Sequence, residues 1–260
     1  MGVWLAVAVP FGAAVGYVAA VDRVRRRGGD WPGWRIGVWF AGLFTAATAI
    51  LGPAVAGRHD FTAHMAGHLL LGMAAPLLLV PAAPVILTLR ALPVPLARRV
   101  ARLLSTRPAR VLTHPVTAAA LNVGGLWLLY GTGLYQQMGT RPWLHLAVHA
   151  HIAAAGYLLT AAVVGVDPAP HRPNRRVRAV VIVAFLAAHD ILAKHLYAHP
   201  PAGVPGGRAR TGAQLMYYGG DMLDLALITV FCWQWYRAAA PRTRPPPLPL
   251  ACPHPAPRRS

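Results

Sequence analysis

The chain has 260 residues, of which 56% are hydrophobic and only 12% are charged. A soluble domain of this length carries about twice that share of charged residues, so the composition indicates a membrane protein. The net charge of +18 comes almost wholly from arginine, in short clusters between apolar runs. That pattern suits phospholipid headgroups and argues against nucleic acid as a partner.

Seven apolar stretches are long enough to span a bilayer, which takes about 20 helical residues. In chain order they cover residues 3–21, 34–52, 64–89, 115–130, 145–166, 177–195 and 215–236. The first is followed, not preceded, by positive charge, so we interpret it as a retained helix rather than a signal peptide. The third contains Pro76, Pro81 and Pro84, and we expect it to be kinked or partly re-entrant.

The fold class predicted from these stretches is all-α: a polytopic membrane protein with about seven transmembrane helices over residues 1–240. Residues 241–260 form a Pro/Arg-rich tail that we expect to be disordered. When the connections are assigned alternately to the two sides, twenty of the 25 basic residues fall on one side. The positive-inside rule then puts the N-terminus outside and the C-terminus and tail in the cytoplasm. Residues 98–110 are expected to lie along the inner surface as a basic interfacial stretch.

With this orientation, nine of the twelve histidines lie at the outer ends of the helices. The outer histidines are His59, His64, His68, His145, His149, His151, His189, His195 and His199, and the inner ones are His114, His171 and His254. Three pairs have the spacing HxxxH, which places two side chains one turn apart on one helix face, where they can share a metal ion. The pairs are His64 with His68, His145 with His149, and His195 with His199.

These pairs differ in how well they can be aligned. Asp60 extends the first pair by one further turn. His151 is two residues beyond His149, so those two side chains cannot both face one site on an ideal helix. His199 precedes two prolines, which end a helix, so the third pair need not be aligned. Two well-spaced pairs on one side favour a metal site over histidines that only solvate helix ends.

The residue types favour copper(I) as the metal. The chain contains no glutamate, so the HExxH metalloprotease mechanism is excluded. The two cysteines form no CxxC pattern, which argues against a thiolate site. Imidazole suits copper, zinc and iron, and a thioether such as that of Met65 favours copper(I). Haem would favour single histidines at mid-membrane depth rather than pairs near one end.

Several short stretches resemble the CtaG-type cytochrome c oxidase assembly factors of bacteria. They are HMAGH at 64–68, APLLL at 75–79, AP at 83–84, HAH at 149–151, GY at 156–157, GVDPAP at 165–170, HD at 189–190, GAQ at 212–214 and GD at 220–221. The resemblance covers most of the chain in order. It implies a seven-helix protein of the bacterial plasma membrane that matures haem-copper oxidase, with oxidase subunits as partners and copper supplied on the outer side. Asp221 stands where the family often has glutamate.

The predicted metal site combines the outer histidines with nearby acidic groups. Its ligands are expected among His64, His68, His149 and His189, with His145 and His151 competing for one place and Met65 nearby. Asp60, Asp190 and Asp221 are expected to orient imidazoles. A carrier of this kind catalyses no reaction.

Two other classes of function remain open at this point. A membrane oxidoreductase would hold haem between histidine-bearing helices, and a metal-free scaffold would hold oxidase subunits during assembly. A transporter fits less well, because no chain of ionisable residues crosses the middle of the membrane.

Overall fold

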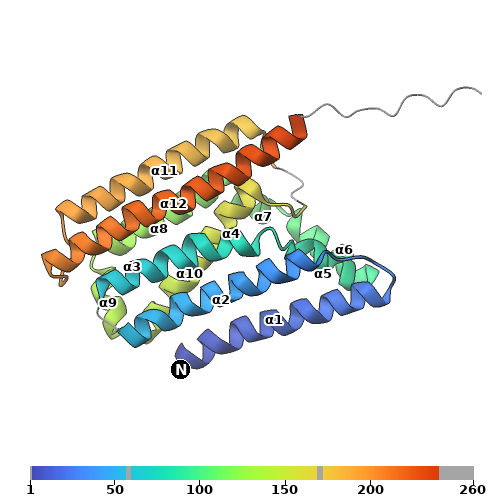
Figure 1. Ribbon diagram of the computed structural model, residues 1–260, viewed down its shortest axis with the longest axis horizontal. Helices are drawn as coiled ribbons and strands as arrows, with labels where there is room; N and C mark the ends of the chain where they lie inside the picture. Colours follow the sequence, from blue (N-terminus) through green and yellow to red (C-terminus); the bar gives the residue numbers. More distant parts are fainter. Residues whose placement is uncertain (1, 57–59, 169–171, 240–260) are drawn as a thin grey trace, which may run out of the picture.

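The computed structural model describes residues 2–56, 60–168 and 172–239, and every regular element in these ranges is a helix (Figure 1). The elements are α1 (Gly2–Arg26), α2 (Gly33–Ala56), α3 (Phe61–Leu69), the π-helical turn η1 (Leu70–Ala74), α4 (Ala75–Leu79), α5 (Pro84–Ala91), α6 (Val94–Leu104), α7 (Arg107–Leu112), α8 (Pro115–Gly131), α9 (Leu134–Thr140), α10 (Pro142–Val164), α11 (Arg175–Ala198) and α12 (Gly206–Ala239). The predicted all-α class is confirmed. The predicted tail, His59, His171 and His254 lie outside the described residues.

Five of the described helical segments are long and apolar enough to cross a membrane. They are Gly33–Gly52, Phe61–Leu79, Pro142–Val164, Arg175–Ala198 and Gly206–Ala239. The other two predicted spans correspond to α1 and the 17-residue α8. The count of seven and the orientation therefore stay predictions. Large apolar side chains such as Phe44, Val183 and Leu225 are exposed on these helices, as expected where a helix faces lipid.

The third predicted span is interrupted near its prolines, as expected. Pro76 has no N–H to donate to the carbonyl of Gly72, and the helix passes through η1 at this point. The Gly72 carbonyl lies directly against Gly156 of α10, where any side chain would collide with it. After α4 the chain turns at Ala83, which has a positive φ of 54°, and α5 begins at Pro84.

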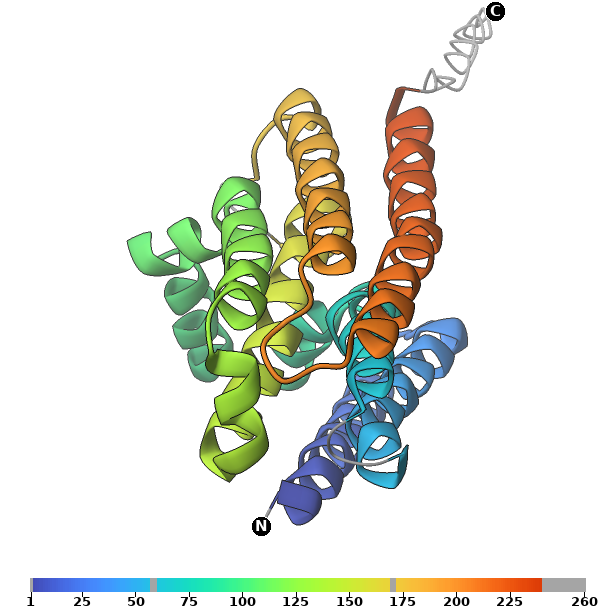
Figure 2. The ribbon, with the colours of Figure 1, turned by 90° about the vertical axis from the view of Figure 1, so that its left-hand side faces the viewer.

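The segment formed by α3 and η1 lies in the middle of the bundle (Figure 2). α3 packs against α12 and α2, and η1 packs against α10. α12 also packs against α11, and α10 against α8. Side chains from α3, α10, α11 and α12 therefore meet in one interior.

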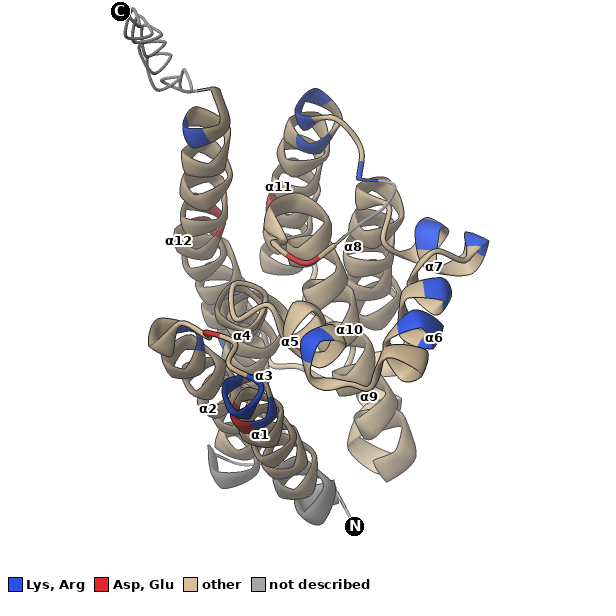
Figure 3. Cartoon of the chain, turned by 90° about the vertical axis from the view of Figure 1, so that its right-hand side faces the viewer, with Lys and Arg blue, Asp and Glu red and all other residues tan. Residues whose placement is uncertain are grey.

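Many of the arginines lie at one end of the bundle, which faces the viewer in Figure 3. At this arginine end α1 and α12 finish, α11 begins, and α6 and α7 lie side by side. The predicted interfacial stretch, residues 98–110, forms most of α6 and α7, and neither helix has a buried residue. Asp167, in the connection after α10, accepts hydrogen bonds from the N–H groups of Val85 and Ile86 and so holds the start of α5.

Candidate functional site

His64 and His68 lie one turn apart on α3, and both side chains are buried. The helix begins after Asp60, whose carboxylate accepts hydrogen bonds from the N–H groups of Thr62 and Ala63. Such a cap fixes the first helical turn, and with it the direction of His64. The structure therefore places Asp60 as the cap of α3.

Each of these two histidines faces a histidine from another helix. The ring centroids of His64 and His149, on α10, are 6.0 Å apart. Those of His68 and His189, on α11, are also 6.0 Å apart, with the ring planes inclined by 29°. All four side chains are buried, and we call them the histidine row. These four residues are the ones that the sequence favoured as ligands.

The inner pair of the row, His68 and His189, has buried ring nitrogens without partners. None of its four nitrogens forms a hydrogen bond within the part of the chain that the structure describes. His189 is completely buried, with 0% of its surface exposed. A buried polar group normally has a hydrogen-bond partner, so an orphaned one points to a bound water or ion.

Two glycines bring helix backbones against this inner pair. A Cβ atom added to Gly220 of α12 would come within 2.7 Å of His189 Cε1, and one added to Gly72 would lie 3.6 Å from His68 Cε1. The backbone thus closes on both rings.

At the outer end of the row, Tyr130 of α8 joins His64 to Met65. Its hydroxyl oxygen lies 3.1 Å from His64 Nε2, and the hydroxyl donates to Met65 Sδ at 3.6 Å. Which of His64 Nε2 and the Tyr130 hydroxyl donates in this hydrogen bond depends on the tautomer of His64. Tyr130 is a member of the site that the sequence did not predict.

Aromatic side chains cover the outer end of the row. Tyr135, on the short helix α9, meets His64 edge-on with ring centroids 5.1 Å apart, and Phe61 meets Tyr135 edge-on at 5.3 Å. Burial raises the pKa of Tyr135 to about 12, and Asp60 adds to this shift. The Tyr135 phenol is therefore neutral at physiological pH.

The structure separates the competing histidines of α10. His145 stacks on His149 with ring centroids 4.1 Å apart. His149 Nδ1 donates to the carbonyl oxygen of His145 at 2.8 Å, which leaves Nε2 with the lone pair. His151 instead points to α8, where its Nε2 lies 3.0 Å from the carbonyl oxygen of Leu121. Of the two residues expected to compete, His145 adjoins the row and His151 does not.

The acidic residues near the inner pair differ in burial. Asp221 is exposed, and Asp190 is half-buried with Oδ1 unpaired. Asp224, which the predicted site did not include, is buried, and neither of its carboxylate oxygens has a hydrogen-bond partner among the described residues. Its only sequence signal was its position three residues after Asp221.

A small cavity connects Asp224 to residues that contact the inner pair. Gly72 and Phe185 line this cavity together with Asp224. Gly72 adjoins the ring of His68, and the Phe185 ring stacks on His189 with centroids 5.9 Å apart. A buried carboxylate at this place can balance a positive charge held by the inner pair.

The third histidine pair lies elsewhere on α11. His195 packs against Trp127 of α8 with ring centroids 5.2 Å apart, and its ring stacks on that of His199 at 4.6 Å. His199 is the residue at which α11 ends, as the following prolines predicted. These contacts join α11 to α8 and do not extend to the histidine row.

The spacing of the row can be compared with that of a metal site. Two imidazoles on one ion have ring centres at most about 6 Å apart, because a metal–nitrogen bond is about 2 Å long. Both pairs of the row are near this limit. In the described ranges, no three His, Cys, Asp or Glu side chains are placed to hold one ion together. Within the described residues, the row therefore brings its imidazoles together two at a time.

Comparison with known protein families matches residues 15–238 to the cytochrome c oxidase caa3 assembly factor family, Caa3_CtaG. The chain belongs to this family. The match runs from within α1 to the last turn of α12, so the whole histidine row of this Caa3_CtaG member falls inside it. The family resemblance found in the sequence is thereby confirmed.

Three mycobacterial proteins are similar to this Caa3_CtaG member. The uncharacterized protein ML1998 of Mycobacterium leprae is 34% identical over 183 residues, 67% of this chain. The uncharacterized proteins Mb0105 of Mycobacterium bovis and MT0111 of Mycobacterium tuberculosis are each 36% identical over 187 residues, 68% of this chain. The aligned part is 28% of the length of each relative. No solved structure matches the chain.

Proposed function

We propose that this protein binds copper(I) at the histidine row and delivers it to a haem-copper cytochrome c oxidase during assembly of that enzyme. The observation that carries the proposal is the inner pair, where His68 and His189 face each other at 6.0 Å with four buried, unpaired nitrogens. Family membership supports the link to oxidase assembly. On this proposal the protein acts without catalysing a reaction.

The donor types of the row suit a transferable copper(I) ion. Neutral imidazoles and the thioether of Met65 bind copper(I) without first losing a proton, unlike thiols. A site without thiolates holds copper less tightly, so the ion can pass to another protein. Asp224 would balance the charge of the ion inside the bundle, and Tyr130 would hold His64 in place beside Met65.

The proposal places the histidine row in the outer half of the bacterial plasma membrane. The arginine end is then cytoplasmic by the positive-inside rule. The oxidase subunit that accepts copper would approach the opposite end, where α9 covers the row.

Copper content of the purified full-length protein tests the proposal. The inner pair is removed in the double variant His68→Ala/His189→Ala, and His195→Ala serves as the matched control because His195 packs outside the row. Under reducing conditions with copper added, we expect the wild type and the control to retain copper through gel filtration and the double variant to lose it. Equal retention by the double variant would contradict the proposal.

A metal-free scaffold is the second candidate, and the lack of any three metal-binding side chains around one point in the described residues favours it. The two candidates differ in the oxidase. A copper carrier without its inner pair leaves the oxidase assembled but short of copper, whereas a scaffold with the same substitutions leaves oxidase copper and activity unchanged. Copper analysis of oxidase purified from cells that carry each variant decides between them.

A further inference from the structure

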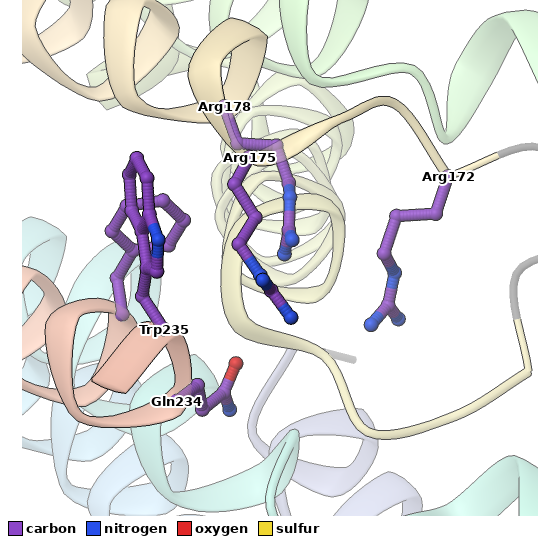
Figure 4. A pocket seen from close by; sticks show the side chains of 6 residues that line it. Arg172, Arg175, Arg178, Gln234 and Trp235 are labelled. Atoms are coloured by element: carbon purple, nitrogen blue, oxygen red, sulfur yellow. The ribbon is translucent and has the colours of Figure 1, made fainter. Parts of the chain in front are cut away.

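A second polar site lies at the arginine end of the bundle. The end of the histidine row that Tyr135 covers is at the opposite end. There a cavity of about 170 Å³ opens between α11 and α12 (Figure 4). Three arginines line one side, and an amide and two aromatic rings line the other. The lining residues are Arg172, Arg175, Arg178, Phe231, Gln234 and Trp235. We call this cavity the arginine pocket.

Arg178 is the buried member of the arginine pocket, with only 8% of its surface exposed. One of its terminal nitrogens donates to the carbonyl oxygen of Val163 at 2.7 Å, and the guanidinium lies 5.5 Å from the centre of the Phe231 ring. Its Nε is buried and has no hydrogen-bond partner among the described residues. A buried guanidinium with an unused donor is expected to face an acceptor.

The three guanidinium groups extend in the same direction, toward the level of Gln234 (Figure 4). In the described part of the chain, none of the three forms an ion pair with a carboxylate. The carboxylate of Asp167 accepts its hydrogen bonds from the start of α5, and Arg172 donates only to the Asp167 carbonyl oxygen, at 3.0 Å. Among the described residues, the three guanidinium groups are therefore without a paired carboxylate.

Electrostatics in the pocket favour an added anion. Burial lowers the pKa of the Arg172 guanidinium, and Asp167 opposes that shift only in part. Like charges held close together at low dielectric repel one another, and an anion between them removes the repulsion. Guanidinium groups present paired donors that match the oxygens of a phosphate.

The surroundings of the pocket place it at the depth of lipid headgroups. The last turns of α12 carry Trp233 and Tyr236, both exposed, and Trp235 forms a wall of the pocket. Exposed tryptophan and tyrosine next to arginine mark the membrane–water interface. A soluble anion would not need the apolar wall of Phe231 and Trp235, whereas the glycerol part of a lipid can pack on it.

We propose that the arginine pocket binds the phosphate of an anionic phospholipid headgroup. The phosphate oxygens would accept from Arg172, Arg175 and the free donor of Arg178, and the start of the acyl chains would lie along Phe231 and Trp235. Such a lipid joins the start of α11 to the end of α12. This site is independent of copper and of the histidine row.

The test uses the full-length protein in detergent, with phosphatidylglycerol or phosphatidylcholine added and bound lipid measured by native mass spectrometry. The test variant is Arg172→Gln/Arg175→Gln, which spares the buried Arg178. Arg176→Gln is the matched control, because Arg176 is exposed on the same turn and does not line the pocket. The midpoint of thermal unfolding in detergent reports that each variant is folded.

Each lost guanidinium contact to phosphate is expected to lower affinity about tenfold. We therefore expect wild type and Arg176→Gln to retain phosphatidylglycerol, and the double variant to lose it at least tenfold. Equal loss in Arg176→Gln would overturn the proposal, since it would show attraction by surface charge alone. Equal retention of phosphatidylcholine, or displacement of the lipid by millimolar inorganic phosphate, would also overturn it, and the latter would assign the pocket to a free phosphate ion.

Discussion

The imidazole of His189 on α11 lies against the backbone of Gly220 on α12, so closely that a Cβ at position 220 would come within 2.7 Å of His189 Cε1. Gly220→Ala therefore pushes on a buried ring. Overpacking of this kind lowers the free energy of unfolding by about 1–3 kcal/mol. This loss exceeds the ~1 kcal/mol by which alanine stabilises a helix relative to glycine. We expect a lower midpoint of thermal unfolding and weaker copper retention. Gly207→Ala is the control, because a Cβ at position 207 would have no neighbouring atom within 4 Å. It is expected to lower neither the unfolding midpoint nor copper retention.

Tyr130→Phe removes the hydroxyl that joins His64 to Met65. The loss of a buried hydrogen bond is expected to lower the free energy of unfolding by about 1 kcal/mol. Copper retention should persist, because the inner pair is untouched. Tyr135→Phe is the matched control, since the Tyr135 hydroxyl forms no hydrogen bond among the described residues. If Tyr130→Phe lost copper as completely as His68→Ala/His189→Ala, the metal site would have to be moved to His64 and His149.

Asp224→Asn is expected to affect stability and copper binding in opposite directions. Its carboxylate is buried with both oxygens unpaired, so neutralising it should stabilise the metal-free protein by about 1–3 kcal/mol. The same change removes the negative charge that we propose balances the copper ion, so copper retention should fall. Thermal unfolding with and without copper measures both effects. Asp221→Asn, at an exposed position, should change neither, and a similar response from both variants would argue against a role for Asp224.

Asp167 controls the start of α5 through two backbone hydrogen bonds. Asp167→Ala removes both acceptors and is expected to destabilise the protein by about 1–2 kcal/mol. Asp167→Asn keeps one acceptor oxygen and should cost less. Unfolding midpoints of the two variants near neutral pH give the comparison, and equal midpoints would show that the hydrogen bonds contribute little.

The same residue predicts a dependence of stability on pH. Burial raises the pKa of Asp167 above its usual value, and this outweighs the hydrogen bonds from Ile86 and Val85. Below the pKa that Asp167 has in the unfolded chain, its carboxyl is protonated in both the folded and the unfolded state. Its contribution to the free energy of unfolding is then fully present. In the unfolded chain Asp167 releases its proton at a lower pH than in the folded protein. As pH rises through the pKa of the folded state, this contribution to stability is therefore lost. The difference in stability between wild type and Asp167→Asn should therefore change across this acidic range. A constant difference would contradict the assignment.

The sequence predicted the long helices well because most of them are continuous apolar runs. It also predicted the break at Pro76 to Pro84, since proline acts on the backbone locally. The short helix α9 has no such pattern and was missed. The site was predictable where it depends on spacing along one helix, as for His64 and His68.

The remaining members of the site depend on which face of a helix is buried. α12 is apolar on most sides, so its sequence does not reveal that Asp224 faces inward and Asp221 outward. Spacing showed that His149 and His151 must diverge, but only packing against α8 decides which one joins the row. Tyr130 is 66 residues from His64 and has no sequence relationship to it.

The π-helical turn η1 lies between the two histidines of α3 and the rest of that span. A π turn accommodates one residue more than an α-helical turn. It therefore rotates α3, which precedes it, by about 100° about the helix axis relative to α4, which follows it. The facing of His64 and His68 toward α10 and α11 is thus set by a register shift, not by those residues themselves. Deleting one residue between Leu70 and Ala74 would restore regular winding and rotate both imidazoles away from their partners, with every histidine still present.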